Sequence, residues 1–235
     1  MDRIAIITGG SSGLGSQIAY KLAQKGFHSV IIGRNKKKLE KIHSKIIESK
    51  GKCTLIQLDL CQDNCSKVIK KKIDKIKGKV EVIVNNAGIG IFKNVEMLSI
   101  GDWQKMISLN LTAAFLLTKL YVPEMKKNKK GILIYINSVA GKKGYPFSSG
   151  YVASKFALRG FAESVREEMR AEGIKVVSIF PGAIDTPLWD QVDSQFDRKE
   201  MMTIEEVAET IISTVDFKNI SVIEELVIRR IKGDF

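Results

Sequence analysis

The chain of 235 residues has little of several residue types that mark whole classes of protein. Its three cysteines, Cys53, Cys61 and Cys65, are odd in number and closely spaced, which predicts neither a disulfide framework nor a zinc ligand set. The two histidines, His28 and His43, have no metal-ligand spacing, so we expect no metal site. No apolar run is long enough to predict a membrane-spanning helix, and the first residues show no signal-peptide pattern. We therefore expect a reduced, cytoplasmic protein with no membrane partner.

Acidic residues are also in the minority. Lys and Arg number 38 against 26 Asp and Glu, which gives a formal net charge of +12. The excess is mostly lysine, in clusters such as Lys36–Lys38, Lys70–Lys72 and Lys126–Lys130, whereas arginine, the usual bidentate reader of bases and phosphates, is sparse. No aromatic residues interleave with these clusters. We predict solvated helix faces and no nucleic-acid partner, while an acidic partner or an anionic cofactor stays open.

Strand-like and helix-like segments alternate along the whole chain without a linker, a repeat or a low-complexity stretch. Short runs rich in β-branched residues predict strands at Arg3–Thr8, His28–Gly33, Lys52–Leu58, Val80–Asn85, Ile132–Asn137, Lys175–Phe180 and Ile223–Arg230. Helical segments are predicted at Leu14–Lys25, Lys36–Ser49, Asn64–Lys77, Gly101–Lys127, Tyr151–Ala171 and Ile204–Val215. Several strands are continuous apolar runs, as strands buried on both faces are. This alternation predicts a single doubly wound α/β domain over residues 1–235, with a parallel sheet of about seven strands and helices on both faces.

Chemistry-bearing residues follow the strands, where ligands bind in such a sheet. After the first strand, the segment Thr8–Gly15 opens a helix with Gly9, Gly13 and Gly15 in the order Gly-x-x-x-Gly-x-Gly. Glycines allow a tight turn and let a diphosphate approach the backbone at a helix N-terminus. The segment lacks the lysine of a phosphate-binding NTPase loop, so we do not expect nucleotide hydrolysis. A plain structural turn is the alternative.

The second strand is followed by a cation where dinucleotide folds often carry an acid. An acid there binds the free ribose hydroxyls of NAD, and an arginine accommodates the extra phosphate of NADP. Arg34 stands at this point, with Lys36–Lys38 directly beyond it. Because cations at a helix N-terminus oppose the helix dipole, a nearby anion would account for them. We predict NADP(H) as the cofactor rather than NAD(H); a helix that happens to begin with basic residues is the alternative.

Two further turns are candidates for contacts with a cofactor. Asp59, followed by Leu60, comes after the third strand and could accept a hydrogen bond from an adenine amino group. The sequence Asn-Asn-Ala-Gly at residues 85–88 follows the fourth strand and offers small residues and amides where a nicotinamide-side ribose would lie. Each also fits an ordinary exposed turn, since Asn and Gly tolerate a left-handed backbone.

The fifth strand leads to a serine, Ser138, and a glycine-rich loop then leads to a tyrosine and a lysine. Tyr151 and Lys155 are four residues apart, so their side chains share one face of the predicted helix. A cation beside a phenol favours the phenolate and lowers the tyrosine pKa from about 10 toward the range of an acid/base catalyst. The Ser138 hydroxyl could bind a carbonyl oxygen at the same place. Taken alone, such a pair more often decorates a solvated helix in a lysine-rich chain.

The sixth strand is followed by a long segment with little predicted structure, Pro181–Trp189, which suits a mobile lid over a substrate or a plain surface loop. Asn110 lies in the middle of the helix predicted at Gly101–Lys127, where asparagine is a mediocre helix former. It marks either a local distortion that serves the site or a solvent-facing side chain. We expect a mostly apolar substrate pocket drawn from residues 89–92, 140–147 and 183–189.

Together these motifs resemble the short-chain dehydrogenase/reductase family over nearly the whole chain. The residues that carry the resemblance are Thr8-Gly9-x-x-x-Gly13-x-Gly15, Asn85-Asn86-Ala87-Gly88, Asn110, Ser138, Tyr151-x-x-x-Lys155 and Pro181-Gly182, in the family's order and spacing. The resemblance implies a Rossmann-type fold and an NADP-dependent oxidoreductase that interconverts a ketone or aldehyde with an alcohol by hydride transfer.

The resemblance also implies a role for each matching residue. Tyr151 would exchange a proton with the substrate oxygen, Ser138 would polarise the carbonyl, and Lys155 would lower the pKa of Tyr151 and bind the nicotinamide ribose. Asn110 would anchor a water that links Lys155 to solvent. The implied cofactor contacts are Gly9, Ser11, Ser12, Gly13, Leu14, Gly15, Arg34, Asp59, Leu60, Asn86, Ala87, Gly88, Tyr151, Lys155, Pro181, Gly182, Ile184 and Thr186. The implied substrate contacts are Ser138, Phe147, Tyr151 and Trp189.

The end of the chain bears on the substrate and on assembly. Family members that reduce 3-oxoacyl groups on a carrier protein, and many tetramers, end in a glycine-rich tail, which residues 224–235 lack. The closing pattern is more similar to small NADP-dependent reductases of hydroxy acids, pterins or assorted ketones. Two alternatives stay open: a 3-oxoacyl-carrier-protein reductase and a non-catalytic NADP-sensing regulator. We expect a homodimer or homotetramer paired through the helices near Gly101–Lys127 and Tyr151–Ala171.

Overall fold

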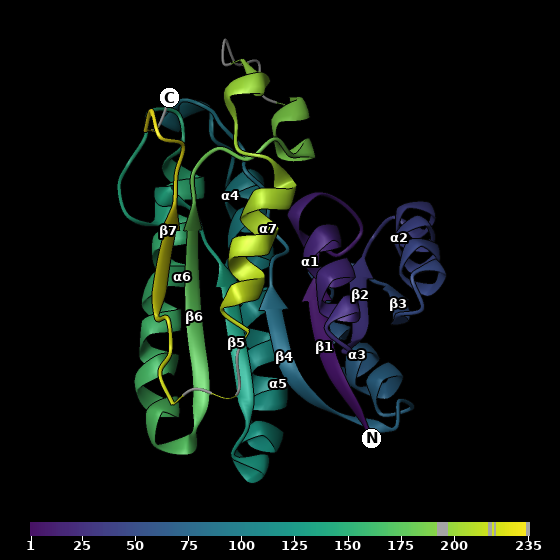
Figure 1. Ribbon diagram of the computed structural model, residues 1–235. Helices are drawn as coiled ribbons and strands as arrows, with labels where there is room; N and C mark the ends of the chain where they lie inside the picture. Colours follow the sequence, from purple (N-terminus) through teal and green to yellow (C-terminus); the bar gives the residue numbers. More distant parts are fainter. Residues whose placement is uncertain (192–196, 216–217, 219, 234–235) are drawn as a thin grey trace.

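The computed structural model describes residues 1–191, 197–215, 218 and 220–233. Within them, one parallel sheet has the strand order β3-β2-β1-β4-β5-β6-β7 (Figure 1). The strands are β1 (Asp2–Thr8), β2 (His28–Gly33), β3 (Lys52–Gln57), β4 (Gly78–Asn85), β5 (Gly131–Ile136), β6 (Ile174–Pro181) and β7 (Glu225–Ile228). The order reverses between β1 and β4, and ligands of such sheets bind beyond the strand ends at this point. The predicted doubly wound parallel sheet is confirmed.

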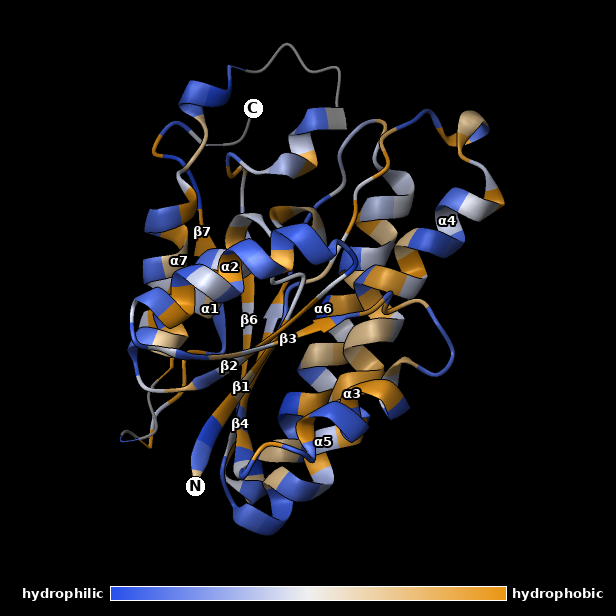
Figure 2. Cartoon of the chain, turned by 90° about the vertical axis from the view of Figure 1, so that its right-hand side faces the viewer, coloured by the Kyte–Doolittle hydropathy of each residue, from blue (hydrophilic) through white to orange (hydrophobic). Residues whose placement is uncertain are grey.

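Helices cover both faces of the sheet (Figures 1 and 2). One face carries α1 (Gly13–Gln24), α2 (Lys36–Glu48) and α7 (Ile204–Ser213). The other face carries α3 (Cys65–Ile73), α4 (Ile100–Ile107), α5 (Ala113–Asn128) and α6 (Ser149–Met169). Short 3-10 turns lie at Val95–Met97, Val139–Gly141, Arg170–Glu172, Pro187–Gln191 and Arg198–Glu200. In Figure 2 the helices turn apolar residues toward the sheet and polar residues outward.

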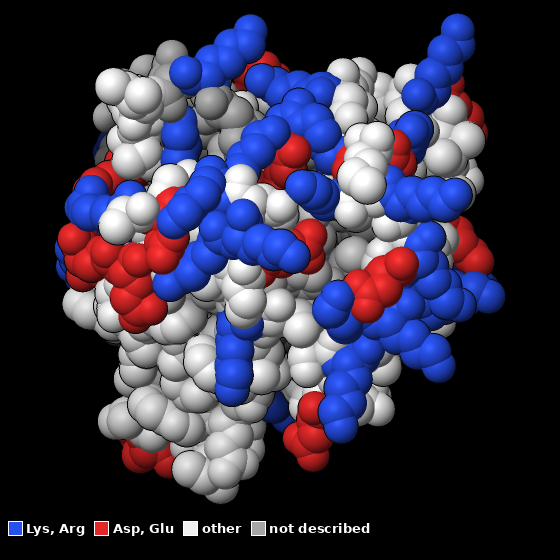
Figure 3. Space-filling view, turned by 90° about the horizontal axis from the view of Figure 1, so that it is seen from below, with Lys and Arg blue, Asp and Glu red and all other residues white. Residues whose placement is uncertain are grey.

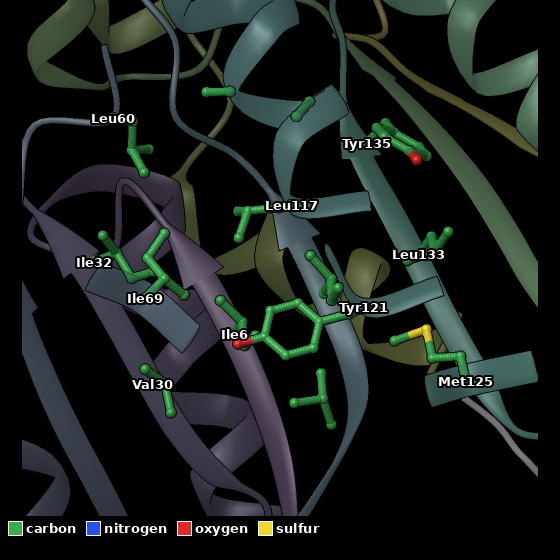
Figure 4. Packing of buried hydrophobic residues seen from close by; sticks show 14 of the residues in the cluster. Ile6, Val30, Ile32, Leu60, Ile69, Leu117, Tyr121, Met125, Leu133 and Tyr135 are labelled. Atoms are coloured by element: carbon green, nitrogen blue, oxygen red, sulfur yellow. The ribbon is translucent and has the colours of Figure 1, made fainter. Parts of the chain in front are cut away.

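The strands are buried on both faces, and successive residues of one strand join different cores. Ile4 and Ile6 of β1 belong to the core under α3, α5 and α6, whereas Ala5 and Ile7 belong to the core under α1, α2 and α7. Figure 4 shows part of the first core, in which Ile6, Val30, Ile32, Leu133 and Tyr135 of the strands lie near Leu117, Tyr121 and Met125 of α5. Burial on both faces is the reason that the strands are continuous apolar runs in the sequence.

Side-chain caps mark where several helices begin. The Ser99 hydroxyl accepts a hydrogen bond from the Asp102 N–H at 3.1 Å, and Thr203 caps α7 in the same way. Each cap satisfies one of the backbone donors that a helix N-terminus leaves unpaired. The boundaries differ from those expected mainly at the ends, since α3 is four residues shorter than Asn64–Lys77 at its carboxyl end and β7 is shorter than Ile223–Arg230.

The helix predicted at Gly101–Lys127 is continuous from 100 to 128, but a π-helical turn at Ser108–Thr112 separates α4 from α5. By length and composition alone this 29-residue helix could cross a membrane, so the prediction that no apolar run is long enough was wrong by that measure. Its inner face packs Leu117, Tyr121 and Met125 into the core. These contacts account for its apolar composition as a core helix of the α/β fold.

Lysine and arginine side chains cover much of the end of the molecule at which β1 begins, with acidic side chains among them (Figure 3). Lys52 lies 2.6 Å from Asp2, and Lys130 lies 2.9 Å from Glu81. The Lys52–Asp2 pair is open to solvent, and such pairs contribute about 0–1 kcal/mol, whereas Glu81 is buried and also pairs with Arg3. The carboxyl ends of the strands, which hold the candidate site, lie at the opposite end of the sheet (Figure 1).

Candidate active site

The glycine-rich loop after β1 is fixed by the residues that follow β4. The Thr8 hydroxyl accepts hydrogen bonds from the N–H groups of Asn86 and Ala87, both at 2.9 Å. The Asn86 side-chain amide donates to the Thr8 carbonyl at 2.9 Å. A Cβ on Gly15 would lie 2.4 Å from Asn86 Nδ2 and 2.5 Å from the Gly9 carbonyl oxygen, so no larger residue fits there. The two strand ends therefore form one rigid cradle of backbone.

The conformation of this loop suits an anionic group at the start of α1. Gly9 and Gly13 have φ values of +65° and +55°, which residues with a Cβ rarely adopt. Ser12 is the N-cap of α1, and among the described residues its side chain makes no capping hydrogen bond. Free N–H groups and the positive end of a helix dipole bind phosphate. The cradle therefore fits the diphosphate of a dinucleotide cofactor.

Arg34 lies beside this loop, at the end of β2. A Cβ on Gly33 would be 3.0 Å from the Ser11 hydroxyl, which shows how closely β2 approaches the loop. Burial raises the pKa of the Cys61 thiol, and the positive charge of Arg34 opposes that rise. The Asp59 carboxylate accepts a hydrogen bond from the Cys61 N–H at 3.0 Å. The predicted adenine and phosphate contacts thus lie on neighbouring strand ends.

Tyr151, in the first turn of α6, faces Ser138 from the loop after β5. The Ser138 backbone is held by the Asn137 side chain, which accepts from the Ser138 N–H at 2.8 Å. The Ser138 hydroxyl accepts from the Ala140 N–H at 3.1 Å. Burial raises the pKa of the Tyr151 phenol, and its hydrogen bond with Ser138 opposes the rise. The two hydroxyls are therefore close enough to bind one oxygen atom of a substrate.

Lys155 is buried, with 4% of its surface exposed, one helical turn beyond Tyr151. Its Nζ donates to the Ile136 carbonyl at 2.9 Å and lies 5.8 Å from the centre of the Tyr151 ring. Burial lowers the pKa of Lys155 to about 8. In this arrangement the Lys155 amine donates to a carbonyl, and burial has the largest influence on the pKa of both groups. That Lys155 lowers the pKa of Tyr151 stays a prediction.

Asn110 lies in the π-helical turn and is 2% exposed. Its side-chain oxygen accepts from the Ile89 N–H at 2.8 Å, and its amide donates to the Ile89 carbonyl and to the Ser154 hydroxyl, both at 2.9 Å. The Ser154 hydroxyl in turn donates to the Tyr151 carbonyl at 2.7 Å. π-helical turns are rare and occur often at functional sites. The predicted local distortion at Asn110 is confirmed, and its side chain is buried.

The backbone of the Asn-Asn-Ala-Gly turn passes between these groups. A Cβ on Gly88 would lie 3.2 Å from Asn110 Oδ1 and 3.7 Å from Lys155 Nζ. The structure therefore brings Asn110, Ser138, Tyr151 and Lys155 together at the end of the sheet that holds the cradle.

The segment after β6 starts against the glycine-rich loop. Side-chain atoms of Thr186 and Pro187 lie 3.6 Å from the Cβ position of Gly13. Ile184 pairs with Met202 in an isolated parallel bridge, so the segment leaves the sheet and returns at neighbouring points. The 3-10 turn Pro187–Gln191 begins inside the predicted lid, Pro181–Trp189. A second 3-10 turn, Arg198–Glu200, follows residues 192–196, which lie outside the described residues.

Arg198 connects the parts of this segment through exposed contacts. Its Nε donates to Asp185 at 2.6 Å, its Nη1 to Asp190 at 2.7 Å and its Nη2 to the Thr186 carbonyl at 3.2 Å. All three charged side chains are more than 40% exposed. Such pairs hold the segment weakly compared with buried hydrogen bonds.

Aromatic side chains from the loop after β4 and the segment after β6 border Tyr151. The Phe92 ring lies 5.6 Å from the Tyr151 ring, tilted by 60°, and 6.4 Å from the Trp189 ring, almost parallel to it at 5°. Phe147 has a left-handed backbone at φ +58° and is 63% exposed, and its carbonyl accepts from the Lys93 N–H at 2.7 Å. A positive φ at a bulky residue is strained, and such strain is frequent near functional sites.

The other predicted contacts occupy varied positions. Leu14, Leu60 and Ile184 are buried apolar side chains. Pro181 is the last residue of β6 rather than a loop residue, and the Gly182 N–H donates to the Ile228 carbonyl at 2.8 Å. Only backbone atoms of these buried residues are suited to touching a ligand.

Sequence reasoning missed the residues that hold the site in place. These are Asn137, Ser154 and Arg198, and Thr8 was part of the glycine-rich motif without a role for its hydroxyl. Asn137 directly follows β5 and could have been found by the strand-end rule. A serine inside a helix and an exposed arginine carry no comparable signal.

Comparison with known proteins agrees with this geometry. The family model described as short chain dehydrogenase matches residues 3–197. A 3beta-hydroxysteroid dehydrogenase from Mediterraneibacter gnavus is 34% identical over 191 residues, which cover 81% of this chain and 69% of that protein. A sepiapterin reductase from Chlorobaculum tepidum is 30% identical over 241 aligned residues, which cover 100% of this chain and 98% of that protein.

Solved structures are similar over almost the full length. An alcohol dehydrogenase from the archaeon Thermococcus sibiricus, complexed with 5-hydroxy-NADP, has a TM-score of 0.88 and 27% identity, covering 98% of this chain and 97% of that one. A metagenomic short-chain oxidoreductase in complex with NADP has a TM-score of 0.85 and 28% identity, covering 97% and 96%. The protein is an oxidoreductase with a nicotinamide cofactor, and its chain belongs to the short-chain dehydrogenase family.

Proposed function

We propose that the protein interconverts a ketone or aldehyde with an alcohol, that NADP(H) is its cofactor and that Tyr151 is the acid/base. The observation that carries the proposal is the meeting of Tyr151, Ser138 and Lys155 beside a cradle that fits a diphosphate. The reductase and dehydrogenase names of the relatives support it.

Two hydroxyls perform the chemistry at the substrate oxygen. When bound, the cofactor supplies the hydride to the carbonyl carbon in reduction and accepts it in oxidation. Ser138 and Tyr151 both donate hydrogen bonds to the carbonyl oxygen and so stabilise the charge that develops on it. In reduction the carbonyl electron pair moves onto that oxygen and takes the Tyr151 proton, which yields the alcohol and a phenolate. Oxidation runs through the same groups in reverse.

Lys155 supplies positive charge to this proton transfer. With a pKa of about 8 its amine is protonated at neutral pH. A turn of the Nζ from the Ile136 carbonyl toward Tyr151 stabilises the phenolate by Coulomb attraction and leaves the ammonium free to bind the nicotinamide ribose. Asn110 is proposed to anchor a water that links Lys155 to solvent.

The chain seats the cofactor along the strand ends. The cradle with Ser11 and Ser12 holds the diphosphate, and Asp59 and Leu60 border the adenine. The nicotinamide side is bordered by Asn86–Gly88, Gly182, Ile184 and Thr186. Arg34 faces the extra phosphate of NADP.

Replacement of Arg34 by glutamine tests the cofactor preference. We expect Arg34→Gln to weaken NADPH binding by about 10- to 100-fold, since a charge-assisted bond to phosphate is lost, and NADH binding by less than about threefold. Fluorescence titration of both reduced cofactors measures this. Equal losses would mean that Arg34 does not contact the phosphate.

Turnover tests the activity itself. The purified protein should consume NADPH with one or more members of a panel of keto acids, 3-oxoacyl thioesters, quinones, pterins and ring ketones. We expect Tyr151→Phe to lose at least about 100-fold in kcat, as removal of a general acid/base does, while its NADPH affinity stays within about threefold. Unchanged turnover in this variant would overturn the role of Tyr151.

We also propose that two copies pair through the outer faces of α5 and α6. Phe115 on α5 and Phe156 on α6 are each more than 40% exposed. A second copy would remove these rings from water. Light scattering of the wild type and of Phe115→Glu measures the mass, and a monomeric wild type would contradict the proposal.

A further inference from the structure

We propose that the substrate carries its carbonyl on a flat ring system, whose face packs between or against Phe92 and Trp189 while the oxygen reaches Ser138 and Tyr151. The inference rests on the proposed carbonyl–alcohol activity and names the substrate class for that same site. It stands on the arrangement of three rings around the reacting groups and on how differently their segments are held.

The orientation of the Phe92 ring determines how a ring stacked on it would approach the Tyr151 hydroxyl. The Phe92 ring is tilted by 60° from the Tyr151 ring, and their centres are 5.6 Å apart. A planar substrate that lies parallel to Phe92 therefore presents its edge, and not its face, to Tyr151. An edge is where a ring ketone or a ketone attached to a ring carries its oxygen.

Trp189 is already parallel to Phe92. The two ring planes differ by 5°, and their centres are 6.4 Å apart. A planar molecule placed between two rings needs about 7 Å between the ring planes, twice the contact distance of about 3.5 Å between carbon atoms. Admission of a flat ring thus requires a translation of Trp189 and no rotation. A puckered ring or a branched chain is thicker and requires a larger displacement.

Phe92 and Trp189 form the two walls of a slot for the flat ring, and their segments are held by different contacts. Phe92 belongs to a loop in which a Cβ on Gly90 would lie 2.7 Å from the Phe92 ring, and the adjacent Lys93 N–H is bonded to the Phe147 carbonyl at 2.7 Å. Trp189 lies between Asp185 and Asp190, the exposed acids that Arg198 holds. Phe92 is therefore the fixed wall, and Trp189 is the wall that can move aside.

Two ketones of one skeleton test the inference. Acetophenone and cyclohexyl methyl ketone have the same connectivity of carbon atoms, but the ring is flat in the first and puckered in the second. Conjugation makes acetophenone the less reactive of the two ketones. A preference of the enzyme for acetophenone therefore comes from contacts with the face of its flat ring and not from its reactivity. We expect kcat/KM with NADPH to be about tenfold higher for acetophenone, which is the scale of one to two aromatic stacking contacts.

Leucine variants locate the preference. We expect Phe92→Leu and Trp189→Leu to remove most of the preference by lowering kcat/KM for acetophenone, with little change for cyclohexyl methyl ketone. Tyr20→Leu, which removes an aromatic ring from α1 far from the site, is the matched control and should keep the preference. A wild type that favours the puckered ketone, or variants that lose both ketones equally, would overturn the inference.

A binding measurement separates this inference from the proposed activity. Ligand-observed NMR of the NADP-loaded protein compares 1-phenylethanol with 1-cyclohexylethanol. Tighter binding of the flat alcohol that is lost in Trp189→Leu supports the binding of a flat ring by Phe92 and Trp189. If neither ketone is turned over, that result contradicts the proposed activity but not this binding. Turnover of the puckered ketone with no preference for the flat alcohol supports the proposed activity and overturns the inference that a flat ring packs against Phe92 and Trp189.

Discussion

The two sides of the candidate site are built in contrasting ways. On the sheet side, buried hydrogen bonds of 2.7–2.9 Å connect Ile89, Asn110, Ser154 and Tyr151, and the Thr8 hydroxyl connects β1 with the turn after β4. On the covering side, the segment after β6 is held by exposed ion pairs of Arg198.

This difference indicates how one fold can keep the geometry of a reaction while the residues that contact the substrate vary. Buried polar groups are costly when a partner is lost, so the sheet side tolerates little change. Exposed ion pairs contribute about 0–1 kcal/mol and can be exchanged. We therefore expect the geometry of the proposed hydride transfer to depend on the first side, and substrate choice on the second.

The largest effect is expected from the buried cation. Lys155→Met should lower kcat/KM by at least about 1000-fold, because both the charge beside Tyr151 and a ligand of the ribose are lost. The same change should raise the free energy of unfolding at pH 7 by at most about 3 kcal/mol, since a charge that burial destabilises is removed. Activity assays and urea titrations measure the two effects.

The pH dependence of the free energy of unfolding shows whether the buried Lys155 charge stabilises or destabilises the fold. Burial lowers the pKa of Lys155 from 10.5 to about 8, so between these values the unfolded chain binds more protons than the folded one. Stability from this group therefore rises with pH over that window, and the rise should vanish in Lys155→Met. The exposed Lys41→Met is the control. A variant less stable than wild type at pH 7 would show that the amine's bond to Ile136 outweighs its burial.

A smaller effect is expected from a positioning residue. Ser154→Ala leaves the Asn110 amide without one acceptor, and should lower the free energy of unfolding by about 1–2 kcal/mol. Because the Tyr151 backbone also loses its bond, we expect kcat to fall about tenfold and the pH profile of kcat to shift, with KM for NADPH unchanged.

The exposed Ser164→Ala on the same helix is the matched control for Ser154→Ala. A loss of stability with an unaltered pH profile would assign Ser154 a purely structural role. On the sheet side of the site, the buried hydrogen bonds that affect catalysis would then be those between Asn110 and Ile89, without the bonds of Ser154.

The smallest effect is expected on the covering side. Arg198→Gln should leave the free energy of unfolding almost unchanged and raise the substrate KM about two- to threefold. Addition of about 0.5 M salt should reproduce the KM effect in the wild type, because salt screens exposed pairs. Lys199→Gln is the adjacent control. A tenfold loss of kcat in Arg198→Gln would show that the two sides are not built differently.

The fold followed from the sequence because strict alternation of buried apolar runs with amphipathic segments allows few topologies. The strand-end rule then predicts that Tyr151, Ser138 and Lys155 lie near each other. All three residues follow the same strand, β5, so their proximity can be expected without knowledge of which strands are neighbours.

Other properties could not be predicted, because they depend on three-dimensional burial. The direction of the Tyr151 pKa depends on how deeply the phenol lies and on where the Lys155 amine points. Ser154 is indistinguishable in sequence from a solvated serine, and Arg198 from any other surface cation. The helix from 100 to 128 did not stand out in the sequence as a long apolar stretch, because lysines and polar residues interrupt it.

The π-helical turn sets a rule for insertions and deletions in this protein. Each residue of a regular α-helix contributes a rotation of about 100°. A π-helical turn closes i→i+5 hydrogen bonds, so it holds one residue more than an α-helical turn for about the same rotation. Loss of one residue from Ser108–Thr112 would therefore restore regular α-helix and leave α4 and α5 in nearly the same relative orientation, but it would displace Asn110 from its bonds to Ile89 and Ser154. The loops around the site can change in length, whereas the extra residue of this helix is needed to place Asn110.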